Sequence, residues 1–328
     1  MIRGLVVGKF APLHSGHQFL ISTARSQCHD LLILSYTSRQ FPGCNAMNRR
    51  RWLEREFPDA HVVVLDETED IPDDDSSDET QRNFAANKLL ELNFIPTHVF
   101  SSEEYGPGFA VYLTDYFHQP VIHVSVDQSR VNQPISATHI RENVHHNRHW
   151  LPGHVYADFV RRVAFIGAES TGKSTLAYWL SQRLQTKYVA EYGRELWIQK
   201  KGHLTYDDML HIAKKQIEIE TLTQESANRY LICDTTPLTT LFYCLNYFGR
   251  ADPRLAGLAR RHYDRLLLLN PDFPLVQDGT RQDEEFRLNQ HHWYLRELMR
   301  RNQTYTLVSG GITERQAELL DMFSLESG

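Results

Sequence analysis

The stretch Gly167-Ala168-Glu169-Ser170-Thr171-Gly172-Lys173-Ser174 decides the fold of half of this chain. It fits the pattern G-x-x-x-x-G-K-[ST], follows the apolar run 162–166, and precedes a helical pattern over residues 175–184. In this strand–loop–helix context, glycines let consecutive backbone N–H groups point at phosphate oxygens, and the helix N-terminus adds the positive end of its dipole. The sequence therefore predicts a nucleoside triphosphate site near the middle of the chain.

Side chains of this loop and of a neighbouring strand are expected to bind the phosphates, hold Mg²⁺ and orient the attacking hydroxyl. Lys173 brings a point charge to the β- and γ-phosphates, and the Ser174 hydroxyl is a ligand for Mg²⁺. Asp234 ends the apolar strand 230–233, and an acidic residue there holds Mg²⁺ or caps the next helix. A carboxylate should also orient the attacking hydroxyl, and the sequence does not decide between Glu191 and Asp234. The residues expected to bind ATP here are Gly167, Ser170, Thr171, Gly172, Lys173, Ser174 and Thr175.

Two arginines late in the chain are typical of a lid. Arg281 closes the run 278–281, and Arg287 lies on the predicted helix 284–301. On a mobile helical hairpin these arginines would bind ATP, exclude water and stabilise the transferring phosphoryl group. Each arginine taken alone is also typical of an exposed helix surface. With the loop and the acidic strand end, they indicate a small-molecule kinase.

A second strand–loop–helix unit opens the chain. The β-rich run 3–7 leads into a loop and then into a helical pattern over 18–26. The loop carries Gly8, Lys9, Phe10, Pro12, His14, Gly16 and His17. It resembles, at every position, the G-x-F-x-P-x-H-x-G-H signature of the HxGH nucleotidyltransferases, which include adenylyl- and cytidylyltransferases. Imidazoles at a helix start can donate hydrogen bonds to phosphate oxygens whose charge grows in the transition state.

Residues 134–141, PISATHIR, resemble the second signature of that superfamily, I-S-x-T-x-x-R. Ser136 and Thr138 suit the cap of a helix, and their hydroxyls could hold a triphosphate. The resemblance implies that Arg141 neutralises developing negative charge. It also implies that His14, His17 and the mobile cation Lys9 are catalytic residues. The implied ATP-binding residues of this half are Gly8, Phe10, His14, Gly16, His17, Ser136, Thr138 and Arg141.

Strand-like and helical patterns alternate along both halves, which predicts α/β folds with parallel sheets. We expect a Rossmann-like nucleotidyltransferase domain over residues 1–150 and a P-loop kinase domain with a lid over residues 151–328. Ligands of such sheets bind at the carboxyl ends of the strands. The run 101–103 and the two signature histidines both follow strand ends, so we expect them at the same edge.

The composition excludes several classes of protein. The net charge of −6 gives no basic footprint for nucleic acid. Four scattered cysteines without a C-x-x-C pair argue against a zinc site or disulfide scaffold and fit a reducing compartment. Met1 leads straight into a strand-like run, and no apolar run approaches membrane-spanning length. The sequence therefore predicts a cytoplasmic protein that binds no membrane.

The chain as a whole resembles the NadR-type bifunctional family, which joins a nicotinamide-nucleotide adenylyltransferase to a ribosylnicotinamide kinase. The resemblance implies that the kinase phosphorylates nicotinamide riboside and that the adenylyltransferase converts nicotinamide mononucleotide and ATP to NAD and pyrophosphate. It implies ATP as co-substrate, Mg²⁺ as cofactor, small-molecule partners only, and a homo-oligomer, as is frequent in the family. The substrate-binding residues that it implies are Ser101, Ser102, Glu103, Glu191, Tyr192, Arg194, Asp234 and Asp278.

Two alternatives stay open at this point. The same pair of folds could act on another riboside or phosphate acceptor, or one half could be an inactive sensor of NAD or ATP. Some family members carry an N-terminal helix-turn-helix domain, but the first strand here is expected at residue 3, so we expect no specific DNA binding. Aromatic side chains that could stack on a base are more typical of a core; they are Trp52, Phe84, Trp150 and Trp197. Residues 66–80 hold nine acidic residues and favour a solvated loop, although the family reading places part of it near the acceptor pocket.

Overall fold

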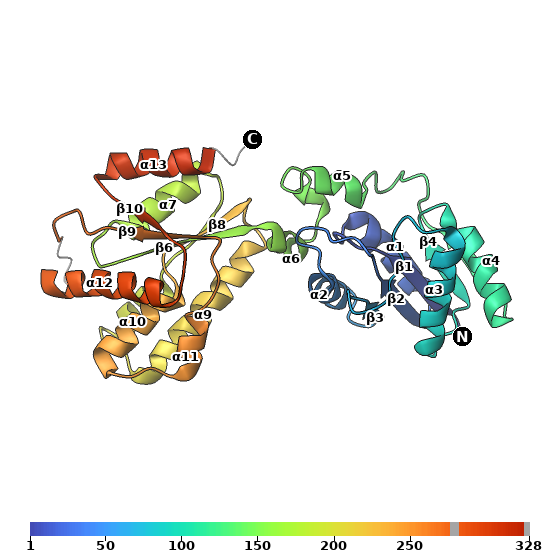
Figure 1. The fold of residues 1–328 in the computed structure, drawn as a ribbon, viewed down its shortest axis with the longest axis horizontal. Helices are drawn as coiled ribbons and strands as arrows, with labels where there is room; N and C mark the ends of the chain where they lie inside the picture. The colour runs from blue at the N-terminus through green and yellow to red at the C-terminus, as the bar shows by residue number, and fades with distance from the viewer. Residues whose placement is uncertain (276–281, 325–328) are drawn as a thin grey trace. The chain divides into compact units, whose positions relative to one another are not determined.

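The computed structural model describes residues 1–275 and 282–324 (Figure 1). Asp278 and Arg281, two of the expected site residues, lie outside this part of the chain. The chain divides into two compact units, Met1–Phe159 and Val160–Gly328, and each has one parallel sheet. The predicted α/β class is confirmed. Within the described residues, no helix is both long enough and apolar enough to cross a membrane.

Residues 151–159, which the sequence analysis assigned to the second half, group with the first unit. Their side chains explain the difference. Trp52 Nε1 donates to Asp158 Oδ2 at 2.6 Å, and Arg51 pairs with the same carboxylate. The Tyr156 hydroxyl and His145 Nδ1 are 2.8 Å apart. These contacts hold the end of the first unit to its body.

The first unit has a five-stranded sheet in the order β3-β2-β1-β4-β5, with all neighbours parallel. The strands are β1 (Arg3–Gly8), β2 (Asp30–Ser35), β3 (His61–Val64), β4 (His98–Ser101) and β5 (Ile122–Ser125). The helices are α1 (Ser15–Gln27), α2 (Ala46–Glu56), α3 (Asp78–Glu91), α4 (Tyr105–Phe117), α5 (Ala137–Glu142) and α6 (Gly153–Tyr156), with short 3₁₀ turns η1 (Arg148–Trp150) and η2 (Ala157–Phe159). β1 and β4 are adjacent although β2 and β3 separate them in the chain. The strand order therefore reverses between β1 and β4, where open α/β sheets bind their ligands.

The second unit has a five-stranded parallel sheet in the order β10-β9-β6-β8-β7. The strands are β6 (Arg161–Gly167), β7 (Lys187–Val189), β8 (Tyr230–Cys233), β9 (Arg265–Leu269) and β10 (Thr306–Val308). The helices are α7 (Lys173–Arg183), α8 (Tyr192–Gln199), α9 (Tyr206–Gln224), α10 (Pro237–Phe248), α11 (Pro253–Leu258), α12 (Glu284–Arg300) and α13 (Ile312–Ser324). β6 is the central strand, with β8 and β7 on one side of it and β9 and β10 on the other. The loop after β6 therefore lies at the point where the strand order reverses.

Apolar side chains on both faces of each sheet make the cores, as expected for parallel strands covered by helices. In the first unit Leu5, Val99 and Phe109 belong to one fully packed cluster. In the second unit Phe165 and Leu267 belong to a cluster that includes the inner face of α7. These cores fix the carboxyl ends of the strands, from which the site loops start.

Candidate active site

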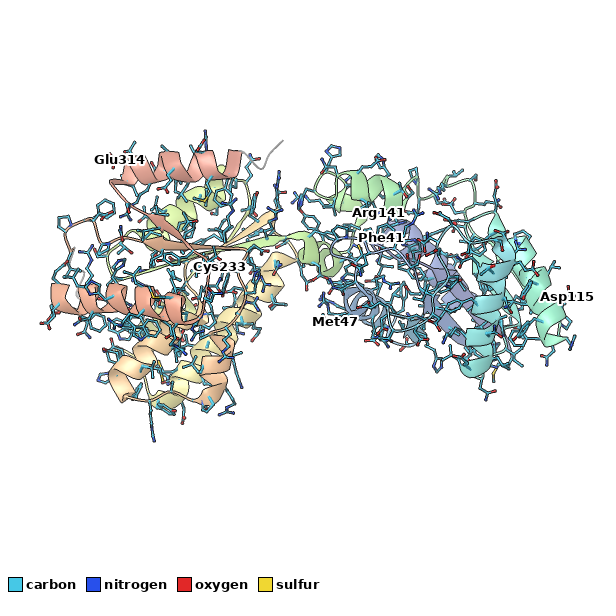
Figure 2. All side chains as sticks on the ribbon, viewed as in Figure 1. Phe41, Met47, Asp115, Arg141, Cys233 and Glu314 are labelled. Atoms are coloured by element: carbon cyan, nitrogen blue, oxygen red, sulfur yellow. The ribbon has the colours of Figure 1, made fainter. Side chains whose placement is uncertain are left out.

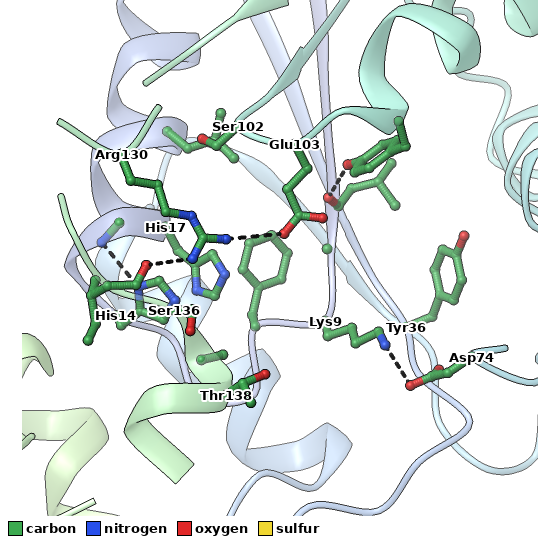
Figure 3. A pocket seen from close by; sticks show the side chains of 18 of the residues that line it. Lys9, His14, His17, Tyr36, Asp74, Ser102, Glu103, Arg130, Ser136 and Thr138 are labelled. Atoms are coloured by element: carbon green, nitrogen blue, oxygen red, sulfur yellow. Dashed lines mark hydrogen bonds and ion pairs between the residues drawn. The ribbon is translucent and has the colours of Figure 1, made fainter. Parts of the chain in front are cut away.

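The first unit has a cavity of about 460 Å³ at the reversal of its strand order. Its lining includes the loop after β1, the segment after β4, and the start of α5 (Figure 3). The expected residues that line it are Gly8, Lys9, Phe10, His14, Gly16, His17, Ser102, Glu103, Ser136, Thr138 and Arg141. Two signatures separated by more than a hundred residues thus meet in one cavity.

The two signature histidines form a stacked pair at the start of α1. His14 is the N-cap residue of this helix, and its Nδ1 accepts a hydrogen bond from Gly16 N at 3.1 Å. The His17 ring stacks on the His14 ring with centroids 3.7 Å apart, and Phe10 packs edge-on against His17 at 5.0 Å. The ring positions are therefore set by a helix cap and an aromatic neighbour.

Both imidazoles are neutral in this site. Burial lowers the pKa of His14 to about 3, with help from the charges of Arg130 and Arg141. Burial also lowers the pKa of His17 well below its ordinary value, and the neighbouring His14 adds to this. Because His14 Nδ1 is a hydrogen-bond acceptor, the ring proton must be on Nε2. The ring therefore offers one N–H donor, which is what a phosphate oxygen in the cavity requires.

The second signature caps α5 as expected. Ser136 is its N-cap residue and accepts from His139 N at 3.2 Å. Arg141 bridges the two signatures, because its Nη1 donates to Ala11 O at 2.5 Å and its Nη2 to Thr138 Oγ1 at 2.9 Å. Its guanidinium also lies over the Phe41 ring at 4.3 Å, and Figure 2 labels both side chains. The arginine is thus oriented before any ligand binds.

Lys9 is held at the opposite side of the cavity by a carboxylate that the sequence analysis did not single out. Its Nζ lies 2.7 Å from Asp74 Oδ2, and this carboxylate is only 5% exposed (Figure 3). Asp74 also accepts from the Thr37 hydroxyl and from Ser38 N, each at 3.1 Å. Asp74 belongs to the acidic stretch 66–80, so the favoured interpretation of that stretch as a solvated loop was wrong at this residue. Part of it lines the cavity, as the family reading placed it.

Arg130 is a second residue of this cavity that the sequence analysis missed, and it is a cation. It lines the cavity, its guanidinium lies 3.9 Å from Glu103, and it donates to Ile135 O at 3.4 Å (Figure 3). Arg130 lies in an irregular loop before the second signature, where no periodic pattern could have marked it. Ser101, by contrast, has to be removed from the expected cavity residues. It is buried beneath the cavity, and its hydroxyl contacts His123 Nε2 at 2.9 Å.

The second unit has its own cavity, of about 300 Å³, around the loop after β6. Gly167 has φ +150° and Gly172 has φ +82°, conformations that favour glycine, and a Cβ on Gly167 would lie 2.9 Å from Leu269 O. The expected residues that line this cavity are Gly167, Ser170, Thr171, Gly172, Lys173, Ser174, Thr175, Glu191 and Arg194. The predicted phosphate-binding loop, strand before it and helix after it are all present.

Lys173 and Asp234 are close enough to affect each other's charge. Lys173 Nζ donates to Ala168 O at 2.7 Å, and burial lowers its pKa against the opposing charges of Glu191 and Asp234. Burial raises the pKa of Asp234, opposed by hydrogen bonds from Ser174 and Tyr188 and by the charge of Lys173. Asp234 Oδ2 accepts from Tyr188 Oη at 2.9 Å, whereas its buried Oδ1 has no hydrogen-bond partner.

The two candidate carboxylates occupy different places. Glu191 lines the cavity, and burial raises its pKa, with a further contribution from Asp234. Asp234 is not among the described residues that line the cavity, and its side chain is buried. Arg194, one turn into α8, lies 4.0 Å from Glu191. Tyr192 points elsewhere, because its hydroxyl contacts His211 Nε2 at 3.1 Å outside the cavity, so it is not a lining residue.

Three aromatic side chains line part of this cavity. Trp197, Tyr243 and Tyr247 line it, and the last two rings stack with centroids 5.8 Å apart. Tyr243 Oη donates to Glu169 Oε1 at 3.0 Å. Of the four aromatic residues considered from the sequence, Trp52 is fully buried in the core of the first unit, whereas Trp197 faces this cavity.

Arg287 has a different place from the one expected of a lid arginine. Its side chain is fully buried in α12, where Nε donates to Glu169 O at 3.0 Å and Nη1 pairs with Glu284 at 3.1 Å. The prediction that it closes over ATP on a mobile hairpin must be revised, because its donors already serve the backbone of the phosphate-binding loop. The other expected lid arginine lies outside the described residues.

Comparison with known proteins gives related sequences for most of the chain. A family model described as an AAA domain matches residues 162–315. The trifunctional NAD biosynthesis/regulator protein NadR of Salmonella typhimurium is 32% identical over 297 residues, which cover 85% of this chain and 71% of that protein. The protein of the same name from Escherichia coli is 32% identical over 300 residues, with the same shares covered.

Two solved structures share the fold over nearly the whole chain. A NadR protein in complex with NR has a TM-score of 0.74 at 22% identity, with 99% of this chain and 96% of that chain covered. A NadR protein in complex with NAD and AMP-PNP has a TM-score of 0.72 at 22% identity, with 100% and 96% covered.

Proposed function

The chain belongs to the NadR family, and from this premise we propose that it is a bifunctional enzyme of NAD salvage. The second unit phosphorylates nicotinamide riboside with ATP, and the first unit joins the resulting nicotinamide mononucleotide to the AMP part of ATP. The products of the second step are NAD and pyrophosphate. The observation that supports this most directly is that each unit has its own phosphate-binding cavity, built from its own residues.

In the kinase step, the 5′-hydroxyl oxygen of the riboside attacks the γ-phosphorus of ATP and ADP leaves. Glu191 is the carboxylate that receives the hydroxyl proton, because it lines the cavity whereas Asp234 does not. The raised pKa of Glu191 brings its basicity closer to what a general base needs near neutral pH. Lys173 and the backbone N–H groups of the loop balance the charge on the phosphates.

Ser174 and Asp234 fit a Mg²⁺ ion. Hydroxyl and carboxylate oxygens are the ligands that Mg²⁺ prefers, and Asp234 Oδ1 is buried without another partner. Among residues 1–275 and 282–324, no three His, Cys, Asp or Glu side chains gather as a metal site. A cation held by one carboxylate, one hydroxyl and the phosphates of ATP agrees with this. When bound, Mg²⁺ would neutralise charge on the β- and γ-phosphates.

The walls of the second cavity suit the ring of the proposed substrate. Nicotinamide riboside carries a pyridinium ring, which is a permanent cation. Aromatic faces attract cations, and Trp197, Tyr243 and Tyr247 provide three of them. The carboxylates of Glu169 and Glu191 line the same cavity and add a favourable field. A neutral riboside would gain the stacking but not the electrostatic attraction.

In the adenylyl transfer, a phosphate oxygen of the mononucleotide attacks the α-phosphorus of ATP and pyrophosphate leaves. No covalent enzyme intermediate is needed, so catalysis comes from positioning and charge stabilisation. His14 offers a neutral N–H donor beside the stacked ring of His17. Arg141 and Arg130 bring positive charge from the second signature and the loop before it. Lys9 faces the same cavity from the opposite side.

The test is a coupled assay with purified protein, ATP, Mg²⁺ and nicotinamide riboside, with products separated by chromatography. We expect NAD to form with nicotinamide mononucleotide as intermediate. Mononucleotide that accumulates without NAD would overturn the assignment of the first unit. No consumption of the riboside would overturn the substrate assignment of the second.

A further inference from the structure

The second unit has a buried arginine that the proposed mechanism does not use. Arg315, in the first turn of α13, has no exposed surface. It directly follows Glu314, which Figure 2 labels. Burying a guanidinium is costly unless its N–H groups are satisfied, so its partners should explain why it lies there.

The guanidinium of Arg315 joins three different loops. Its Nε donates to Gly310 O, its Nη1 to Thr171 O, and its Nη2 to Asn270 O, each at 2.8 Å. Nη2 also lies 3.0 Å from Asp272 Oδ2. Thr171 belongs to the phosphate-binding loop, and the other partners follow β9 and β10.

A carboxylate and a ring complete this arrangement. Asp272 Oδ2 also accepts from Gly310 N at 2.7 Å, so Arg315 and Asp272 together tie the loop after β9 to the loop after β10. The Phe273 ring packs against the guanidinium at 4.5 Å. A Cβ placed on Gly172 would meet Phe273 at 3.6 Å, so the ring also borders the phosphate-binding loop.

The strand order indicates which substrate lies next to the loops after β9 and β10. Glu191 follows β7, and α10 with its aromatic residues follows β8, so the riboside cavity lies toward the β7–β8 half of the sheet. The phosphates of ATP bind at the loop after the central strand β6. Since the acceptor approaches from the β8 side, the nucleoside of ATP must lie toward β9 and β10. The loops that Arg315 joins are those of the ATP side.

We propose that Arg315 is a positioning residue for ATP in the second unit: it fixes the position of the loop containing Thr171 relative to the loops after β9 and β10. The inference rests on the proposed kinase function of this unit. Because Arg315 bonds the phosphate-binding loop at the Thr171 carbonyl, its replacement should affect ATP binding and leave the riboside site intact.

The test variant is R315K, which keeps the charge and loses the planar fork of donors. We expect the KM for ATP in riboside phosphorylation to rise about tenfold or more, and the KM for the riboside to stay within twofold. Arg296, exposed on α12, supplies the matched control R296K, for which neither KM should move. Adenylyl transfer in the first unit should be unchanged in both variants, and an unchanged KM for the riboside reports that the second unit is folded.

A purely structural role for Arg315 predicts a different result. The melting temperature of R315K would fall, and either both KM values would change by the same factor or only kcat would decrease. That result, or no change at all, would overturn the proposal. If R315K does not fold, D272N is the second variant, because Arg315 then keeps its three carbonyl partners. D272N should raise the KM for ATP by a smaller factor and leave the riboside KM unchanged, and any other pattern counts against the proposal.

Failure of the proposed function can be told apart from failure of this inference. If the wild-type protein phosphorylates no riboside, a titration with fluorescent N-methylanthraniloyl-ATP still tests Arg315. K173A identifies the binding phase that belongs to the second unit. Weaker binding in that phase for R315K supports the inference, and equal binding overturns it.

Discussion

The imidazole rings of His14 and His17 stack with centroids 3.7 Å apart and an angle of 28° between their planes. Two imidazolium ions could not share this position without strong repulsion, whereas two neutral rings can. The lowered pKa of both histidines agrees with the geometry. Both histidines of this cavity are therefore neutral, and the positive charge that lines it comes from Lys9, Arg130 and Arg141.

The neutral pair predicts a flat pH profile for adenylyl transfer. The pH dependence of kcat/KM reports ionisations of the free enzyme. Since the pKa of His14 is lowered to about 3 and that of His17 is also lowered, neither ring gains a proton between pH 6 and 8. We expect kcat/KM for ATP to show no inflection near pH 6.5 in that interval. An acid limb there that disappears in H14Q would contradict the neutral assignment.

The two cavities predict independent chemistry. K173A removes the cation of the phosphate-binding loop and should reduce riboside phosphorylation by a factor on the order of 10² to 10³, the range typical for loss of one charge-stabilising group. H17A should reduce adenylyl transfer to a similar extent. Each variant should keep the other reaction within twofold, measured separately with riboside and with mononucleotide as substrate. Loss of both reactions from either change would mean that the sites depend on each other.

The sequence predicted the site loops because their chemistry is local. A loop that binds phosphates through its backbone needs Gly167, Gly172 and Lys173 at fixed spacing. The histidine signature is equally short in sequence. α4 was not predicted, because Gly106, Pro107 and Gly108 interrupt the helical pattern in its first turn. Proline is tolerated in a first turn, and the buried face that stabilises the helix comes from tertiary packing.

The rest of the candidate site depends on contacts that no local pattern encodes. Asp74 enters the cavity only because the loop around it folds back onto Lys9 and Ser38. Arg287 is a similar case, since it was predicted to be a lid arginine that binds ATP and only the packing of α12 against the phosphate-binding loop buries it. Arg315 was not singled out at all, because its partners are three backbone carbonyls and one carboxylate from three separate loops.

Glu191 and Asp234 should respond differently to loss of charge. E191Q removes the proposed base and should lower kcat of the kinase by roughly 10²- to 10⁴-fold at pH 7.5, the range of general-base catalysis. Burial raises the pKa of Glu191, and the active form is the deprotonated one. The kinase kcat/KM of the wild type should therefore fall as the pH drops through this raised pKa, and E191Q should lack that acid limb. A limb that persists in E191Q would assign it to another group.

D234N should act on the metal instead. The substitution keeps the shape of the side chain and the contact with Tyr188 but weakens an oxygen ligand for Mg²⁺. We expect the Mg²⁺ concentration for half-maximal kinase activity to rise several-fold, with partial recovery of rate at high Mg²⁺. A rate loss that no Mg²⁺ concentration reverses, together with an unchanged E191Q, would exchange the roles of the two carboxylates.

The bond from Trp52 Nε1 to Asp158 Oδ2 predicts that the stretch 151–159 stabilises the first unit alone. D158A leaves a buried indole N–H without an acceptor, which costs about 1–3 kcal/mol. Unfolding of the first unit, followed in urea by loss of adenylyl transfer, should shift to lower denaturant, and the midpoint for kinase activity should stay in place. Asp115, exposed on α4 and labelled in Figure 2, gives the control D115A, whose effect should remain within about 0.5 kcal/mol. If D158A moved the kinase midpoint instead, residues 151–159 would serve the second unit, as the pattern of the sequence had suggested.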